Sequence, residues 1–208
     1  MNLSDLEVKV RALLNNPATT ELSNTVIDYS WARALDRYSQ FKSRKEFYYA
    51  AEFKTIANIQ KYDIPAETMS IRACRIYTLL ADLKADINNF EDYEINQPGY
   101  TGYGDFDWAF LNNLLELSKI PATEDAGKFI GLLLYKAHVF TSGVCSTIPR
   151  AEFEGHLLNW VKGDLLETWA GYAGSLSYGS GREDRGPLRE EARKLKEAAE
   201  KSWAAGLV

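Results

Sequence analysis

The chain has 208 residues, of which 46% are hydrophobic and 25% charged, and its formal net charge is −5 at pH 7. This size and apolar content predict one domain, or a domain with a sub-domain, around a sizeable buried core. The acidic balance and the lack of a block of five basic residues argue against a protein that grips nucleic acid by neutralising its phosphates. An acidic protein can still surround DNA without holding it.

The ends and the cysteines of the chain also limit where it can work. The opening sequence MNLSDLEVKV is charged and has no hydrophobic core region, so we expect no signal peptide. No apolar run approaches the roughly 18 residues of a membrane span. Cys74 and Cys145 stand alone in apolar contexts. They therefore favour buried free thiols in a reducing compartment over a disulfide.

Two short helices are predicted at the N-terminus. Ser4-Asp5-Leu6-Glu7 has the S-x-x-E form of a capping box, and the apolar spacing that follows predicts a helix over residues 4–15. The Asn15-Asn16-Pro17 sequence ends it. After Ser23 a second apolar stripe predicts a helix over residues 23–39.

The next segments favour strands. Residues 46–53 are rich in aromatic side chains, and residues 54–62 carry spaced apolar side chains among polar ones. Pro65 predicts a turn over residues 63–67, because proline fixes its own φ and restricts the residue before it. Apolar and polar residues then alternate over residues 69–79, which is typical of a partner strand. Together these segments predict a small antiparallel β element.

The middle of the chain is acidic and then apolar. Residues 82–107 hold seven carboxylates against one lysine, which predicts a solvated loop. Apolar residues over 108–120 predict a short helix closed by Pro121. The run at 129–135 fits either a buried strand or a helix. We favour a strand because the run is short and follows a glycine.

Two further helices are predicted toward the C-terminus. Apolar residues recur at steps of three and four over residues 149–172, with Pro149 in the first helical turn and Gly171 and Gly174 as stop signals. A glycine-rich break follows. Residues 187–204 then form a less hydrophobic helix with a thin apolar stripe that ends at Trp203.

The predicted fold class is α+β and mostly α, an amphipathic helix bundle with a small antiparallel β element. We expect residues 1–174 to form the helix-bundle core with its β element, including an acidic loop and short-helix insertion over 82–127. Residues 175–208 are expected to form a flexible loop and a C-terminal docking helix.

No catalytic or metal-binding motif is recognisable. His138 and His156 lack a partner at metal-ligand spacing, and no nucleophile elbow, H-E-x-x-H helix or P-loop is present. We therefore predict no enzymatic activity, no catalytic residue, no metal and no cofactor. The alternative hypothesis is a helical cytosolic enzyme or regulatory subunit whose site is assembled from scattered residues such as Glu154, His156 and Asp164.

One arrangement is familiar. The sequence QKYDIPAE at residues 60–67, followed by the strand at 70–77, resembles the Y-x-Leu/Ile-Pro-Ala-Asp turn and strand of tailed-bacteriophage neck proteins. The order of elements is also similar, with Thr147-Ile148-Pro149 opening the long helix before a glycine-rich break and a charged last helix. Over most of its length the chain resembles the head-to-tail connector, or adaptor, family. The stretch 82–127 is longer than the usual pattern.

This resemblance implies a virion structural protein that is not an enzyme. Members of the family form a ring, typically twelve-fold, beneath the portal. Implied partners are the portal ring, tail or neck proteins and further copies of the chain. Double-stranded DNA passes through the lumen during ejection without sequence-specific binding, and no membrane is involved. The implied location is the neck of the virion, after assembly in the host cytoplasm.

The last segment is the predicted partner-binding region. Its stripe is thin and its tail apolar, so we expect the loop and last helix to dock on the portal or on a neighbouring subunit. The candidate partner-binding residues are Arg182, Arg185, Leu195, Trp203 and Leu207. An ordinary intramolecular antiparallel helix pair over 187–199 is the alternative.

Overall fold

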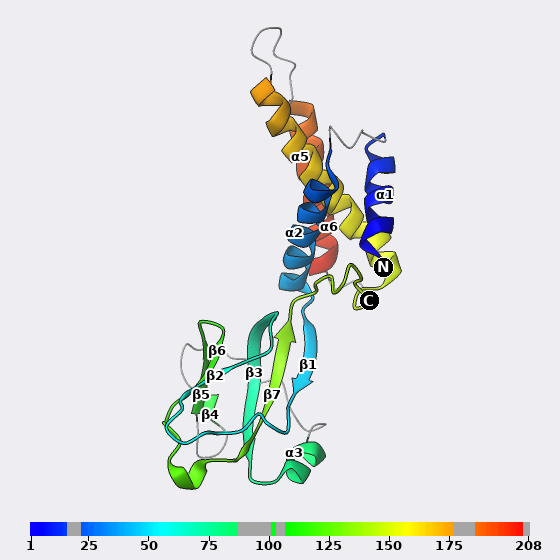
Figure 1. The fold of residues 1–208 in the computed structure, drawn as a ribbon. Helices are drawn as coiled ribbons and strands as arrows, with labels where there is room; N and C mark the ends of the chain where they lie inside the picture. Colours follow the sequence, from blue (N-terminus) through cyan, green and yellow to red (C-terminus); the bar gives the residue numbers. More distant parts are fainter. Residues whose placement is uncertain (16–21, 87–100, 103–106, 177–185, 206–208) are drawn as a thin grey trace. The chain divides into compact units, whose positions relative to one another are not determined.

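The structure is a computed structural model, which describes residues 1–15, 22–86, 101–102, 107–176 and 186–205 (Figure 1). The chain divides into two compact units. Residues 1–42 and 138–208 form the first, which we call the helical unit. Residues 43–137 form the second, the β unit.

The helical unit is built from both ends of the chain. Its first two helices are α1 (Leu3–Leu13) and α2 (Asn24–Phe41). The long helix begins as α4 (Arg150–Glu152), continues through a π-helical turn, η3 (Phe153–Leu157), and becomes α5 (Leu158–Leu176). The last helix is α6 (Gly186–Ala204). The four predicted helices are thus present.

The helix ends differ from the predictions in three places. α1 is capped by Asn2, whose side chain accepts from the backbone N–H of Ser4, so the predicted capping box at Ser4 is wrong. An antiparallel bridge between Asn2 and Val144 keeps the chain extended up to Asn2, which sets the earlier start. Pro149 precedes α4 in an extended conformation and is not in the first turn. The predicted stop at Gly171 and Gly174 is also wrong, since α5 continues to Leu176; glycine permits a helix end but does not require one.

The core of the helical unit joins all its long helices. Most residues of the predicted apolar stripes are buried as far as Leu165, but Leu13 of α1 and Trp169 of α5 are each 43% exposed. Trp31 is fully buried and its ring lies 6.1 Å from that of Phe153. Cys145 is a buried free thiol in this core, as expected. The fully buried members are Leu6, Val10, Ile27, Trp31, Ala34, Phe153, Leu157, Val161 and Ala192.

The β unit contains two antiparallel sheets. The first is three-stranded, with order β1-β7-β3, and comprises β1 (Arg44–Tyr48), β7 (Phe129–Lys136) and β3 (Thr68–Tyr77). The second has order β2-β6-β5-β4 and comprises β2 (Lys61–Asp63), β6 (Leu114–Leu117), β5 (Asp107–Leu111) and β4 (Thr101–Gly102). The prediction that 129–135 is a strand is confirmed. A helix, α3 (Leu80–Asp86), and a 3₁₀ turn, η2 (Thr123–Asp125), complete the unit.

The two sheets share one apolar core. Side chains of alternate residues on β7, together with Ile71 and Cys74 of β3, meet side chains of the second sheet, as expected when two sheets face each other. Cys74 is buried there as a free thiol. The core consists of Ile71, Cys74, Ile130, Leu132 and Leu134 from the first sheet and Tyr62, Trp108, Leu115 and Leu117 from the second.

The short helix predicted over 108–120 is wrong, because this segment is the β5–β6 hairpin. Asn112 and Asn113, the two residues between the strands, have φ of 51° and 62°. Two successive left-handed residues are the mark of a type I′ hairpin turn, which matches the twist of the flanking strands. The apolar residues on either side fit a helical period as well, so spacing alone misled the prediction.

The fold class is therefore corrected. The structure is about 48% helix and 24% strand, an α/β mix and not a helix bundle with a small β element. The hairpin adds strands that the sequence did not indicate, although most of the predicted strand over 54–62 is loop and only Lys61 and Tyr62 belong to β2. The solvated loop predicted over 82–107 is wrong at residues 82–86, which belong to α3, and at residues 101–102 and 107, which belong to β4 and β5. Residues 87–100 and 103–106 lie outside the described residues. The predicted boundary at residue 174 falls inside α5.

Candidate functional site

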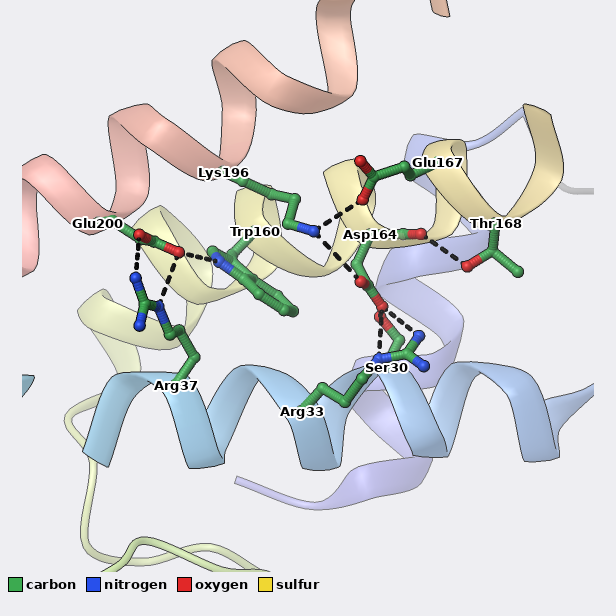
Figure 2. A network of polar contacts seen from close by, with 9 residues as sticks. All are labelled: Ser30, Arg33, Arg37, Trp160, Asp164, Glu167, Thr168, Lys196 and Glu200. Carbon is green, nitrogen blue, oxygen red and sulfur yellow. Dashed lines mark hydrogen bonds and ion pairs between the residues drawn. The ribbon is translucent and has the colours of Figure 1, made fainter. Parts of the chain in front are cut away.

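A polar network connects three helices of the helical unit, and Asp164 of α5 is at its centre (Figure 2). Asp164 is only 7% exposed. Ser30 Oγ donates to its Oδ2 at 2.8 Å, and Arg33 donates to the same oxygen from Nε at 3.1 Å and also from Nη2. Lys196 of α6 approaches Oδ1 at 3.5 Å. A buried carboxylate is costly unless it is paired, and here cations from α2 and α6 compensate the burial.

A second carboxylate of the network lies on α6. Glu200 accepts from Arg37 Nε at 3.0 Å and Nη2 at 2.7 Å, one to each oxygen, and from Trp160 Nε1 at 3.1 Å. The hydrogen bonds from Arg37 lower the pKa of Glu200, and the same contact raises the pKa of the Arg37 guanidinium. This two-pronged geometry fixes α6 against both α2 and α5.

Lysines complete the contacts between α5 and α6. Lys196 donates to Glu167 at 2.8 Å, and its Nζ lies 4.8 Å from the centre of the Trp160 ring. One turn or more away, Lys162 donates to Glu191 at 3.1 Å. Charges of α6 are therefore matched to opposite charges of α5 along the helix pair, which defines how far α6 can slide.

The backbones of α5 and α6 approach closely at Gly163. A Cβ atom at this position would lie 2.8 Å from the carbonyl oxygen of Ala192. Ala192 is fully buried. Any side chain at residue 163 would force α6 away, so the glycine is required for the contact and not for its conformational freedom.

Outside this network, His138 makes hydrogen bonds to three other residues. Its backbone N–H donates to Ser39 Oγ at 2.7 Å, and its ring nitrogens lie 2.7 Å from the Lys42 carbonyl oxygen and 2.8 Å from Thr147 Oγ1. The Cys145 thiol is 3.5 Å from the same hydroxyl. These bonds give His138 a structural role in joining the segments that follow α2 and precede α4.

Tyr38 links this region to the end of α6. Its hydroxyl donates to Glu152, which also accepts from Lys42 at 3.0 Å. Burial raises the pKa of Tyr38, and the hydrogen bond to Glu152 raises it further. The ring of Trp203 packs edge-on against Tyr38 at 5.4 Å and lies 5.8 Å from Phe41. Aromatic packing thus completes the attachment of α6.

The described structure places the predicted partner-binding residues as follows. Trp203 is 2% exposed and Leu195 is half-buried, and both pack on the core of their own helical unit. The structure contains an intramolecular antiparallel pair of α5 and α6. Arg182, Arg185 and Leu207 lie outside the described residues. Binding of a partner by these five residues stays a prediction.

The scattered site of the alternative hypothesis is not brought together. Glu154 pairs with Lys9 and with Arg150, and these hydrogen bonds lower its pKa to about 2. Asp164 has different partners and lies ten residues further along the same continuous helical segment, about 15 Å away. Within the described ranges, no three His, Cys, Asp or Glu side chains form a group able to hold a metal ion.

The network was not predicted, although the sequence contains a signal for it. Asp164 adjoins Leu165 inside the apolar stripe of the long helix, where a carboxylate needs a cation. The polar pairs Arg33/Arg37 on α2 and Lys196/Glu200 on α6 are each spaced four residues apart, so each pair shares one helix face. A buried carboxylate on one helix, together with such pairs on two other helices, indicates an interhelical polar network.

No protein-family model matches the chain, and a comparison with curated proteins found no similar sequence.

Among the helices of the described residues, none is both long and apolar enough to cross a membrane.

Proposed function

We propose that this protein is a virion structural protein, a head-to-tail connector whose copies form a ring beneath the portal of a tailed bacteriophage. The observation that carries the proposal is the turn at Tyr62–Glu67, the segment on which the resemblance to the connector family rests. This turn connects β2 to β3 in the β unit.

This turn leads the chain from the second sheet to the first. The Tyr62 hydroxyl accepts from the Ile56 N–H at 3.2 Å and donates to the Ile59 carbonyl at 2.7 Å, which ties the preceding loop to β2. Thr68 Oγ1 donates to the Pro65 carbonyl oxygen at 2.7 Å. Glu67 has φ of 68°. The side chain of Tyr62 therefore has a defined structural role in the turn, which supports the resemblance at this position.

The order of elements supports the same proposal. Two N-terminal helices come first, then the strands, then a long helix that starts directly after Thr147-Ile148-Pro149, and finally a charged helix. This is the order that the connector resemblance implies. The β unit is larger than that resemblance led us to expect.

The proposed partners are the portal ring, tail or neck proteins and copies of the chain in a ring, which the family resemblance implies is twelve-fold. In this proposal DNA passes through the lumen without base-specific contacts, and the protein resides in the virion neck after assembly in the host cytoplasm.

The test is binding to a portal ring encoded in the same genome, measured by size-exclusion chromatography with light scattering. The purified chain should shift to the portal fraction. Removal of the chain after Gly174 is a poor test, because it would uncover the buried face of α5. Replacing Arg182 and Arg185 by glutamate tests the predicted contact residues, and we expect it to weaken binding.

A matched control is the double replacement Arg189→Glu and Lys201→Glu, which makes the same charge change on exposed residues of α6. It should bind as the unmodified chain does. Equal loss in both variants would indicate a general charge effect and contradict the assignment of Arg182 and Arg185. No association of the unmodified chain with the portal ring would overturn the connector proposal.

A further inference from the structure

We draw no further inference here: the strongest candidate, the cavity of about 530 Å³ in the helical unit between α1 and the segment that opens the long helix, lined by Met1, Asp5, Val8, Lys9, Ile148 and Arg150, carries nothing because Lys9 and Arg150 are already paired with Glu154 and nothing in the structure shows what would occupy it.

Discussion

The two units fix the relative positions of their elements by different means. A helix satisfies its backbone hydrogen bonds internally, so only side chains can set how one helix lies against the next. In the helical unit this task falls to Asp164 and Glu200, each of which contacts residues of two other helices. The register of these helices is therefore encoded in charges.

Strands of the β unit are positioned by the backbone itself. β7 pairs with β1 on one side and with β3 on the other, and their ladders set the register before any side chain acts. The ion pairs of this unit join segments that the backbone has already aligned. Lys61 of β2 pairs with Glu116 of β6, and Arg44 of β1 pairs with Glu67, the residue before β3. Its stability should respond to cavities and turns, whereas that of the helical unit should respond to charges as well.

The largest effect that this comparison predicts comes from a cavity in the β unit. Leu132 is fully buried on the central strand β7. Leu132→Ala should lower the free energy of unfolding by about 2–5 kcal/mol, the usual cost of such a cavity. Urea unfolding followed by tryptophan fluorescence measures it. Leu111→Ala, which changes a side chain that is 49% exposed, is the control and should cost less than about 1 kcal/mol.

The next effect should come from a charge in the helical unit. Asp164→Asn keeps the shape of the side chain but leaves Arg33 and Lys196 without their shared anion. We expect a loss of about 1–3 kcal/mol, less than for a fully buried pair because Arg33 is partly exposed to water. Glu190→Gln, on the exposed face of α6, is the control and should change stability far less, because water screens its ion pairs. A cost for Asp164→Asn as small as this control's would show that charges do not set the helix register.

Most helices could be predicted from the sequence because their information is local. The stripe of Phe153, Leu157, Val161 and Leu165 repeats at a helical period, and α2 covers most of the helix predicted over 23–39. Partners of those helices could not be predicted in the same way. The pairing of Ser30 with Asp164 joins residues 134 positions apart, and no local pattern encodes such a distance.

Strand prediction failed where the same apolar residues fit both the helical and the strand period. Leu111, Leu114 and Leu115 suit one face of a helix, yet they flank the Asn112-Asn113 turn of a hairpin. Turn chemistry decided the outcome, since asparagine tolerates the left-handed region better than other residues with a Cβ. The first sheet depends on the pairing of β7 with β1 and β3, which are far away in sequence, and this is why the size of the β unit was underestimated.

The turn offers a prediction that sharpens the comparison from the side of the β unit. Asn113→Gly should stabilise the protein by about 0.5–1 kcal/mol, because glycine adopts the required positive φ without a steric cost. Asn113→Val should destabilise it by about 1–2 kcal/mol, since a β-branched residue is strained there. Thermal unfolding of the two variants in parallel measures both. The same direction of change in both would contradict a type I′ turn at this position.

The smallest expected effect concerns pH and the contact between α1 and α2. Glu7 accepts from Asn24 Nδ2 at 2.7 Å and lies beside Asp28. Burial raises the pKa of Glu7, and so do its hydrogen bond with Asp28 and the repulsion between the two carboxylates. A raised pKa in the folded state means that protonation of Glu7 favours folding. The contribution is present below the unfolded pKa near 4.5 and is lost as the pH rises through the higher folded value.

Glu7→Gln should therefore stabilise the protein at pH 7, by less than about 1 kcal/mol because the site is partly exposed, and the gain should vanish near pH 4. Glu154→Gln is the matched control with the opposite sign. The pKa of Glu154 is lowered to about 2 by Lys9 and Arg150, so its charged form favours folding. That contribution is present above about pH 4.5 and disappears as the pH falls toward 2, so Glu154→Gln should destabilise the chain at pH 7 and not at low pH. Urea midpoints measure both effects, at pH 4 and pH 7 for Glu7→Gln and at pH 2 and pH 7 for Glu154→Gln. If an ion pair at Glu154 stabilises the position of α1 and a carboxylate pair at Glu7 destabilises it, the two variants must change the stability at pH 7 in opposite directions. Changes in the same direction would mean that net charge, and not these two contacts, governs the N-terminal helix.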